Sequence, residues 1–187
     1  MEKRKIAVAV SGASGAIYAE LLLNTLAQLK ESIDTSLVYT SNAKTVWKEE
    51  RQNEHYDQYD FPVYEIRDYY APFASGSSTF DTLVIVPCSM GTLGRIAGGI
   101  SDNLITRAAD VMLKERRRLI CVIRETPYNL VHIHNMKTVT EAGGIICPAS
   151  PSFYSRPPDM EALAMTVVHR ILRLADIDAG GFKWGEK

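Results

Sequence analysis

The chain has 187 residues, 46% of them apolar and 23% charged, which is ordinary for one globular domain with a full hydrophobic core. Its formal net charge of −1 argues against nucleic acid or an anionic membrane surface as a partner. No apolar run approaches the roughly 20 residues that span a bilayer, and the N-terminal stretch lacks the pattern of a signal peptide, so we expect a cytoplasmic protein.

Apolar β-branched runs alternate along the chain with segments of helical spacing. The runs predict strands at 5–10, 35–39, 63–66, 83–86, 119–123 and 144–147. The helical spacing predicts helices at 16–29, 41–51, 102–117 and 159–174, with Ser101 as the N-cap of the third. Strands that are apolar throughout and separated by helices indicate a parallel sheet covered on both faces. The predicted fold class is therefore α/β, a single doubly wound domain over 1–187 built as a three-layer sandwich.

The cysteines, Cys88, Cys121 and Cys147, each lie in or at an apolar run that predicts a strand. An odd number of cysteines in such places argues against a disulfide framework. We therefore expect three small buried hydrophobic side chains. A catalytic thiolate at Cys88 is the alternative, because this residue stands at a strand end, but no obvious base adjoins it.

The loop after the first strand is the most informative local feature. Residues 11–15 read Ser-Gly-Ala-Ser-Gly and connect an apolar strand to a helix. Backbone N–H groups and the positive end of a helix meet at such a loop, which suits a phosphate, although an ordinary tight turn is an alternative. The second strand ends at Thr40 and Ser41 without the acidic residue that a dinucleotide ribose usually needs. The hydroxyl groups favour a mononucleotide instead.

Two further strand ends carry polar groups. After the strand at 83–86, Ser89, Gly91 and Thr92 stand where a helix begins, which predicts a second nest of hydroxyl and free N–H groups. After the strand at 119–123, Arg124 and Glu125 follow directly. A charged pair next to a buried strand must be solvated or matched, and at this edge of the sheet it lies beside the expected ligand.

A separate small polar segment at 74–78 is either a flexible turn or a loop that wraps an anion. Arg107, Lys114 and Arg170 are candidates to complete a second phosphate site, although each taken singly reads as a solvated helix charge. Arg107 and Lys114 share one face of the third predicted helix. The histidines show no metal-ligand spacing, so no metal is expected.

Together these motifs resemble one known family, the UbiX/Pad-type flavin prenyltransferases. The resemblance runs from Ile6 to about Trp184 and rests on the order and spacing of SGASGA (11–16), ASGSS (74–78), PCSMGTL (87–93), NLITRAADV (103–111), LKERR (113–117), RETP (124–127) and Phe153-Tyr154. It implies a flavodoxin-like fold related to the Rossmann type, reduced FMN and dimethylallyl phosphate as substrates, and no metal. It also implies prenyl transfer to flavin N5 and C6, a UbiD-type decarboxylase that receives the product, and a homo-oligomer, commonly a dodecamer, with its site between subunits.

The resemblance also implies roles for individual residues. FMN is contacted by Gly12, Ala13, Ser14, Thr40, Ser89, Met90, Gly91, Thr92 and Arg124. The prenyl phosphate is held by Ser75, Arg107, Lys114, Tyr154 and Arg170, and Trp184 covers the prenyl tail. Glu50 and Glu125 match carboxylates near the reacting centre, and Tyr69 stands where some relatives have Trp.

These residue types fit the implied reaction. Breaking an allylic C–O bond releases phosphate, which Arg and Lys stabilise, and spreads positive charge over the prenyl unit, which aromatic faces stabilise. Ring closure at C6 then needs a base, for which Glu125 and the released phosphate are both candidates. An FMN-dependent decarboxylase, of the cysteine or aromatic-acid type, and a non-catalytic flavin carrier remain alternatives. The sequence also leaves open whether the product serves ubiquinone synthesis or aromatic-acid degradation.

Overall fold

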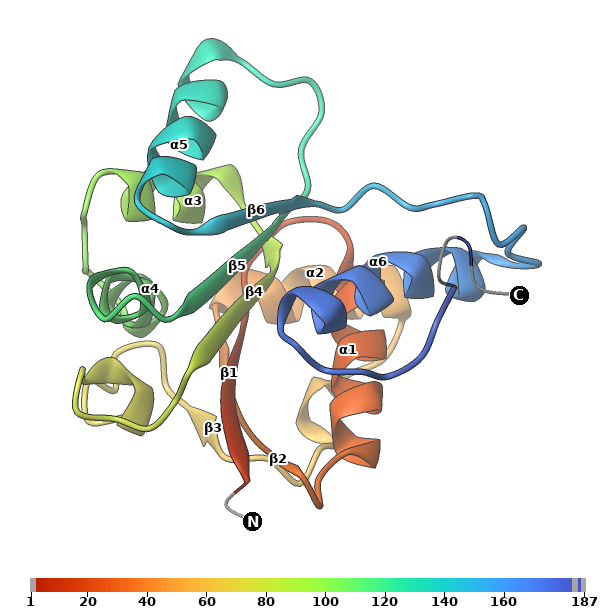
Figure 1. Cartoon of the computed structure of the whole chain (residues 1–187), viewed down its shortest axis with the longest axis horizontal. Coiled ribbons are helices and arrows are strands. Elements are labelled where there is room, and N and C mark those ends of the chain that lie inside the picture. Colours follow the sequence, from red (N-terminus) through yellow and green to blue (C-terminus); the bar gives the residue numbers. More distant parts are fainter. Residues whose placement is uncertain (1–2, 183–184, 186–187) are drawn as a thin grey trace.

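A computed structural model describes residues 3–182 and 185 of the chain (Figure 1). Six parallel strands form one sheet in the order β3-β2-β1-β4-β5-β6. Their bounds are β1 (Arg4–Val10), β2 (Ile33–Tyr39), β3 (Val63–Tyr64), β4 (Thr82–Cys88), β5 (Arg118–Ile123) and β6 (Ile145–Pro148). The middle strands are buried on both faces, which is why their sequences are apolar without alternation.

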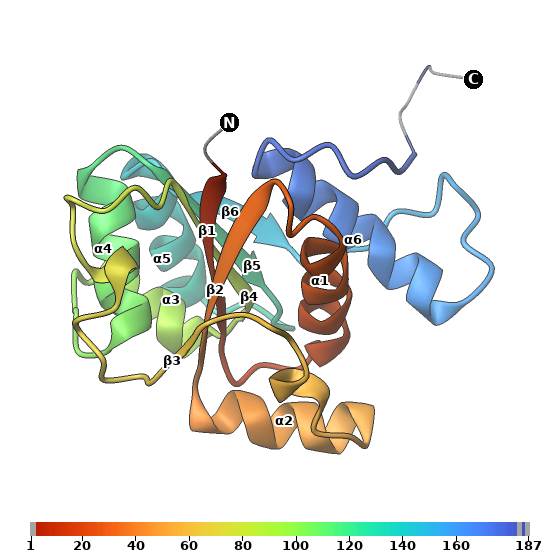
Figure 2. The same ribbon diagram turned by 90° about the horizontal axis from the view of Figure 1, so that it is seen from below.

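The helices cover the two faces of the sheet and form two separate cores. One face packs against α1 (Ala16–Gln28), α2 (Ser41–Arg51) and α6 (Met160–Leu174). The other packs against α3 (Met90–Ala97), α4 (Leu104–Lys114) and α5 (Leu130–Glu141). Figure 2 shows α4 and α6 on opposite sides of the sheet. The α/β fold class and the three layers predicted from the sequence are confirmed.

The strand order reverses at β1, which lies between β2 and β4. From β1 the chain adds β2 and β3 on one side of the sheet and then β4, β5 and β6 on the other. The loops after β1 and β4 therefore lead to helices on opposite faces of the sheet. Parallel doubly wound sheets bind their ligands in the crevice that opens at such a point. The fold therefore places the loops at 11–15 and 88–92 where the sequence analysis expected a ligand.

Several predicted element bounds are wrong. The third helix begins at Leu104, and its N-cap is Asn103 rather than Ser101. Asn103 Oδ1 accepts from the Thr106 amide at 3.1 Å while Thr106 Oγ1 accepts from the Asn103 amide at 3.3 Å, so this reciprocal pair outcompetes a lone serine. The helix also ends at Lys114 instead of residue 117, and the third strand spans Val63–Tyr64 instead of 63–66.

Helix α5 has no counterpart among the predicted helices. Only Val139 of its residues is buried, and its apolar Leu130, Val131 and Ile133 are exposed. A helix whose apolar residues face outward lacks the period on which such predictions depend. Within the described part of the chain, no helix is both long and apolar enough to cross a membrane.

The expectation of three buried free cysteines is confirmed. Contact with the Cys121 thiol, and then burial, raise the pKa of Cys88 well above its ordinary value. Burial of Cys88 together with this raised pKa favours the protonated thiol, which argues against a catalytic thiolate at this strand end.

Candidate functional site

A cavity of about 390 Å³ opens at the carboxyl ends of β1, β2 and β4. We name it the strand-end cavity. The sequence analysis singled out half of the residues that line it, namely Ser11, Gly12, Thr40, Ser89, Gly91 and Thr92. The other lining residues are Asn42, Ile66, Arg67, Arg95, Asp102 and Asn103.

Ser11 joins the two loops that form the floor of this cavity. Its buried hydroxyl donates to the carbonyl oxygen of Pro87 at 2.8 Å and accepts from the Ser89 amide at 2.8 Å. The Ser11 amide also donates to Pro87 at 3.3 Å. A serine with both hydroxyl functions used in this way fixes the loop after β1 against the loop after β4.

Two hydroxyl groups cap the helices that point into the cavity. Thr40 Oγ1 accepts from the Ala43 amide at 3.0 Å and so begins α2. Ser89 Oγ accepts from the Thr92 amide at 3.3 Å and begins α3. First-turn amides of a helix have no partner within the helix, and the helix dipole adds positive partial charge there. Two such ends at one cavity make a site for an anion.

The start of α1 does not take part in this arrangement. The Glu50 carboxylate accepts from the Gly15 amide at 2.9 Å and from the Ala16 amide at 2.8 Å. A side chain of the protein therefore already satisfies these two amides, which argues against a phosphate at the start of this helix. Glu50 holds the end of the loop after β1, which agrees with an orienting role.

We expect Glu50→Gln to lower the free energy of unfolding of the flavin-free protein by about 1 kcal/mol, because the charge that complements the start of α1 is lost. Urea denaturation followed by circular dichroism measures this change. Glu49→Gln is the matched control, since Glu49 is an exposed neighbour on the same helix and should change stability little. Equal stability of the two variants would show that the cap contributes nothing.

Arg124 and Glu125 follow β5 at the same edge of the sheet. Arg124 is exposed, and Glu125 Oε1 accepts from the Thr126 amide at 3.0 Å. Burial raises the pKa of Tyr18, while Arg124 lowers it and Glu50 raises it, so both charges act on this one hydroxyl. The Tyr18 hydroxyl on α1 therefore lies within reach of the charges of Arg124, which follows β5, and of Glu50 on α2. Sequence reasoning missed Tyr18, because it reads as one more residue of a helix.

The segment at 74–78 packs against cations of α4 and of the turn that follows this helix. Arg107 Nε donates to the Ala74 carbonyl at 3.1 Å, and Arg117 Nη2 donates to the Gly76 carbonyl at 2.6 Å. A Cβ on Gly76 would lie 2.7 Å from Lys114 Nζ, so this ammonium group lies directly against the loop. Ser75 is exposed at the same place. The structure therefore brings Ser75, Arg107 and Lys114 together, as the sequence analysis expected.

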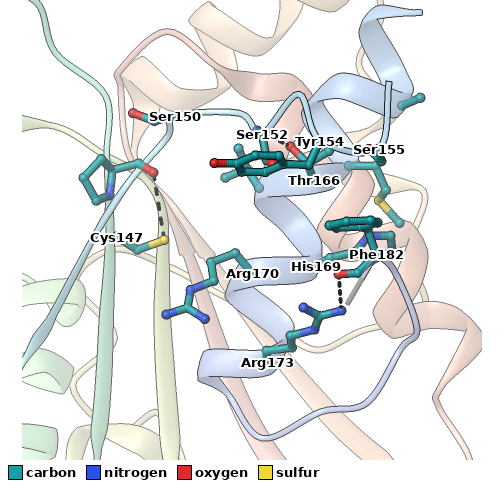
Figure 3. A pocket seen from close by; sticks show the side chains of 14 residues that line it. Cys147, Ser150, Ser152, Tyr154, Ser155, Thr166, His169, Arg170, Arg173 and Phe182 are labelled. Carbon is teal, nitrogen blue, oxygen red and sulfur yellow. Dashed lines mark hydrogen bonds between the residues drawn. The ribbon is translucent and has the colours of Figure 1, made fainter. Parts of the chain in front are cut away.

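Tyr154 and Arg170 line a different cavity, of about 580 Å³, between α6 and the segment that follows β6 (Figure 3). We name it the α6 cavity. Cys147, Thr166, His169 and Phe182 also line it. Tyr154 is 72% exposed, so one chain leaves much of this cavity open to its surroundings.

The predicted phosphate site is thus divided. Arg107 and Lys114 belong to α4 on one face of the sheet, and Arg170 belongs to α6 on the other. The five residues do not gather within one chain, because the crossovers of a doubly wound sheet put these helices on opposite faces. The resemblance implies a site between subunits, which this separation does not contradict.

Where the structure describes them, the remaining predicted residues do not line the strand-end cavity. Ala13 is half-buried, Ser14 is exposed and Met90 is buried, and the strand-end cavity is not lined by any of the three. Tyr69 is 46% exposed in the turn before Ala71. Trp184 lies outside the described residues. Among the described residues, no group of three or more His, Cys, Asp or Glu could hold a metal ion.

The chain matches the Flavoprotein family model over residues 1–177. It is 42% identical over 184 residues to the flavin prenyltransferase UbiX of Methanocaldococcus jannaschii, a match that covers 97% of this chain and 98% of that relative. The chain belongs to the UbiX flavin prenyltransferase family.

Solved structures agree with this assignment to the flavin prenyltransferase family. AnUbiX (PadA1), in complex with FMN and dimethylallyl pyrophosphate, superposes with a TM-score of 0.91 at 42% identity, over 100% of this chain and 99% of that chain. A dodecameric FMN-dependent UbiX-like decarboxylase from Escherichia coli O157:H7 superposes with a TM-score of 0.90 at 33% identity, over 97% of this chain and all of that one.

Sequence reasoning missed the charged wall of the strand-end cavity in this family member. Arg95 Nε donates to the Asp102 carboxylate at 3.2 Å and its Nη1 to the Gly91 carbonyl at 3.2 Å, while Arg67 lines the cavity beside them. Arg95 follows Gly91 by one helical turn, so this spacing could have indicated that both residues line the same cavity. Arg67 lies in a segment with weak periodicity, so its approach to the cavity depends on the fold alone.

Proposed function

We propose that this family member joins the prenyl group of dimethylallyl phosphate to N5 and C6 of reduced FMN. The observation that carries the proposal is the pairing of a strand-end cavity, at which two helix N-termini meet, with a separate set of exposed and half-buried cations that suits a second phosphate. A flavin carrier needs only the first of these. One described chain holds both sets within a single α/β unit, which we take as one domain over 1–187.

We place the FMN phosphate at the N-termini of α2 and α3. Thr40, Ser89 and the first-turn amides supply donors there, and Arg67 adds positive charge, while the charge of Arg95 is matched by Asp102. The ring then extends toward the ends of β1 and β5, where Gly12, Ala13, Ser14 and Arg124 meet it. The phosphate is placed at α2 and α3 rather than at α1 because the Glu50 carboxylate already accepts from the first amides of α1. The start of α1, at the same edge of the sheet, is then left to the ring.

We place the prenyl phosphate between copies of the chain. Ser75, Arg107 and Lys114 of one copy would face Tyr154 and Arg170 of a neighbour, which explains why these side chains are exposed or half-buried in one chain. Closed homo-oligomers commonly build sites in this way. The dodecameric relative supports a homo-oligomer here, with twelve copies as our proposal for its size.

The chain's own residues then do three things. Arg107, Lys114 and Arg170 hold the phosphate and stabilise its negative charge as the allylic C–O bond breaks. Aromatic faces, with Tyr69 as one and Trp184 as another, stabilise the positive charge on the five-carbon unit and exclude water. The bond to N5 replaces the broken C–O bond and releases the N5 proton. The bond to C6 forms after the remaining double bond of the five-carbon unit gains a proton, and Glu125 or the released phosphate accepts the proton lost from C6 as the ring closes. Reduced FMN, when bound, supplies the two ring atoms that form the new bonds.

The product of such a reaction is a modified cofactor. We propose that it passes to a UbiD-type decarboxylase and that both proteins work in the cytoplasm. The pathway that follows, ubiquinone synthesis or aromatic-acid degradation, is set by the decarboxylase rather than by this chain.

Anaerobic incubation with reduced FMN and dimethylallyl phosphate tests the proposal. We expect mass spectrometry to show a flavin that has gained one five-carbon unit, with phosphate released in equal amount. A parallel reaction with dimethylallyl diphosphate identifies the preferred donor. Unchanged flavin with CO₂ released from an aromatic acid or a peptidyl cysteine would instead indicate a decarboxylase. Unchanged flavin that stays bound without turnover would indicate a carrier.

A further inference from the structure

The chain beyond α6 folds back along that helix. We name residues 178–182 the C-terminal tail. Arg173 Nη2 donates to the carbonyl oxygen of Phe182 at 2.8 Å and to that of Gly181 at 3.2 Å (Figure 3). The same Nη2 also donates to the Gly180 carbonyl at 3.5 Å, so one guanidinium group on the last turn of α6 holds three consecutive carbonyls of the tail against the helix.

Gly181 makes the closest approach of the tail to α6. Its φ is +92°, and a Cβ built there would lie 2.4 Å from Nδ1 of His169 and 2.6 Å from Cγ of the same ring. Only glycine fits this position, for both the conformation and the space. Gly180 next to it also has a positive φ, +79°, but a Cβ there meets nothing within 4 Å.

The tail forms one wall of the α6 cavity. His169, Arg170 and Arg173 all line that cavity from α6, and Phe182 of the tail lines it from outside. Burial, and then Arg173, lower the pKa of His169, which favours the neutral ring beside the guanidinium group. The imidazole can therefore pack against Gly181 without repelling Arg173.

We propose that Arg173 is a positioning residue that holds the C-terminal tail as a wall of the α6 cavity, with Gly181 seated against the His169 ring, and thereby sets the affinity for the prenyl phosphate donor. The inference rests on the proposed function, in which Tyr154 and Arg170 bind that donor. Two glycines at positive φ make the tail costly to order. The closed state, in which the tail lies along α6, therefore depends on the hydrogen bonds from Arg173, which we call the anchor. When only a fraction of the molecules is closed, the apparent affinity for a ligand of the closed state falls by that fraction.

Paired glycine variants test the inference. Both Gly180→Ala and Gly181→Ala strain a positive φ, but only Gly181→Ala collides with His169. We expect Gly181→Ala to raise KM for the donor about tenfold with kcat and KM for FMN little changed, and Gly180→Ala to raise it at most about twofold. Arg173→Gln should resemble Gly181→Ala. Adding His169→Ala to Gly181→Ala removes the collision and should recover part of the loss.

Hydrogen exchange of the tail amides gives a readout that does not depend on catalysis. We expect faster exchange at residues 178–182 in Gly181→Ala and Arg173→Gln than in Gly180→Ala. An active enzyme in which the two glycine variants share one KM for the donor would overturn the inference and leave the proposed function standing. If the wild-type protein transfers no prenyl group but Arg173→Gln still speeds hydrogen exchange of the tail, the proposed function is overturned. The role of Arg173 in holding the tail would then still stand.

Discussion

Two inactive variants are expected to restore each other when they are assembled into one oligomer. Arg107→Ala and Arg170→Ala should each lower prenyl transfer by about 100-fold, because each removes a cation that stabilises the leaving phosphate. If the site takes Arg107 from one copy and Arg170 from a neighbour, random mixing of equal amounts leaves about a quarter of the sites with both arginines. Activity measured after co-expression with two different affinity tags, on oligomers purified through both, should rise accordingly.

The expectation follows from the separation of these residues by the sheet. Arg107 packs with its loop on the α4 face, and Arg170 lines the α6 cavity on the opposite face. The matched control mixes Arg107→Ala with Lys114→Ala. Those two residues lie on one helix, so every mixed site lacks one of them and no recovery is expected. Equal recovery in both mixtures, or none in either, would contradict a site shared between copies.

Sequence reasoning located the strand-end cavity because it used a property that all doubly wound sheets share. Ser11, Thr40 and Ser89 each follow a predicted parallel strand, and the carboxyl ends of parallel strands meet at one edge. No knowledge of helix packing is needed for that step. The same reasoning could not assign Glu50, which reaches the start of α1 from 35 residues away through the packing of α2 beside α1.

The second phosphate site shows where pattern reasoning ends. The seven-residue spacing of Arg107 and Lys114 places them on one helix face in any fold, and the structure confirms that both lie at the 74–78 loop. Which face of the sheet each helix covers depends on the direction of each crossover. Arg170 therefore could not be placed relative to Arg107 from the sequence, and in one chain the sheet separates them.

Gly12→Ala is expected to disturb the strand-end cavity more than a methyl group added at Gly91, the other glycine in its lining. A Cβ on Gly12 would lie 2.5 Å from Cβ of Asn42, so the loop after β1 must move away from α2. Such overpacking costs about 2 kcal/mol, which corresponds to about a 30-fold loss of FMN affinity if the cost falls on the bound geometry. Titration of the flavin-free protein with FMN, followed by flavin fluorescence, measures the dissociation constant.

Asn42→Gly provides the partner for a double-mutant cycle. In Gly12→Ala/Asn42→Gly the nearest contacts of the new methyl group are the backbone carbonyl carbon of residue 42 at 3.3 Å and its Cα at 3.5 Å, which small shifts accommodate. Asn42→Gly alone lowers stability by only about 0.3 kcal/mol, since asparagine is itself a poor helix former. Gly12→Ala should therefore weaken FMN binding much less in the Asn42→Gly background than in wild type. If the two substitutions act additively on the dissociation constant, the collision with Asn42 does not control the cavity, and the loop after β1 does not contact the flavin where we place it.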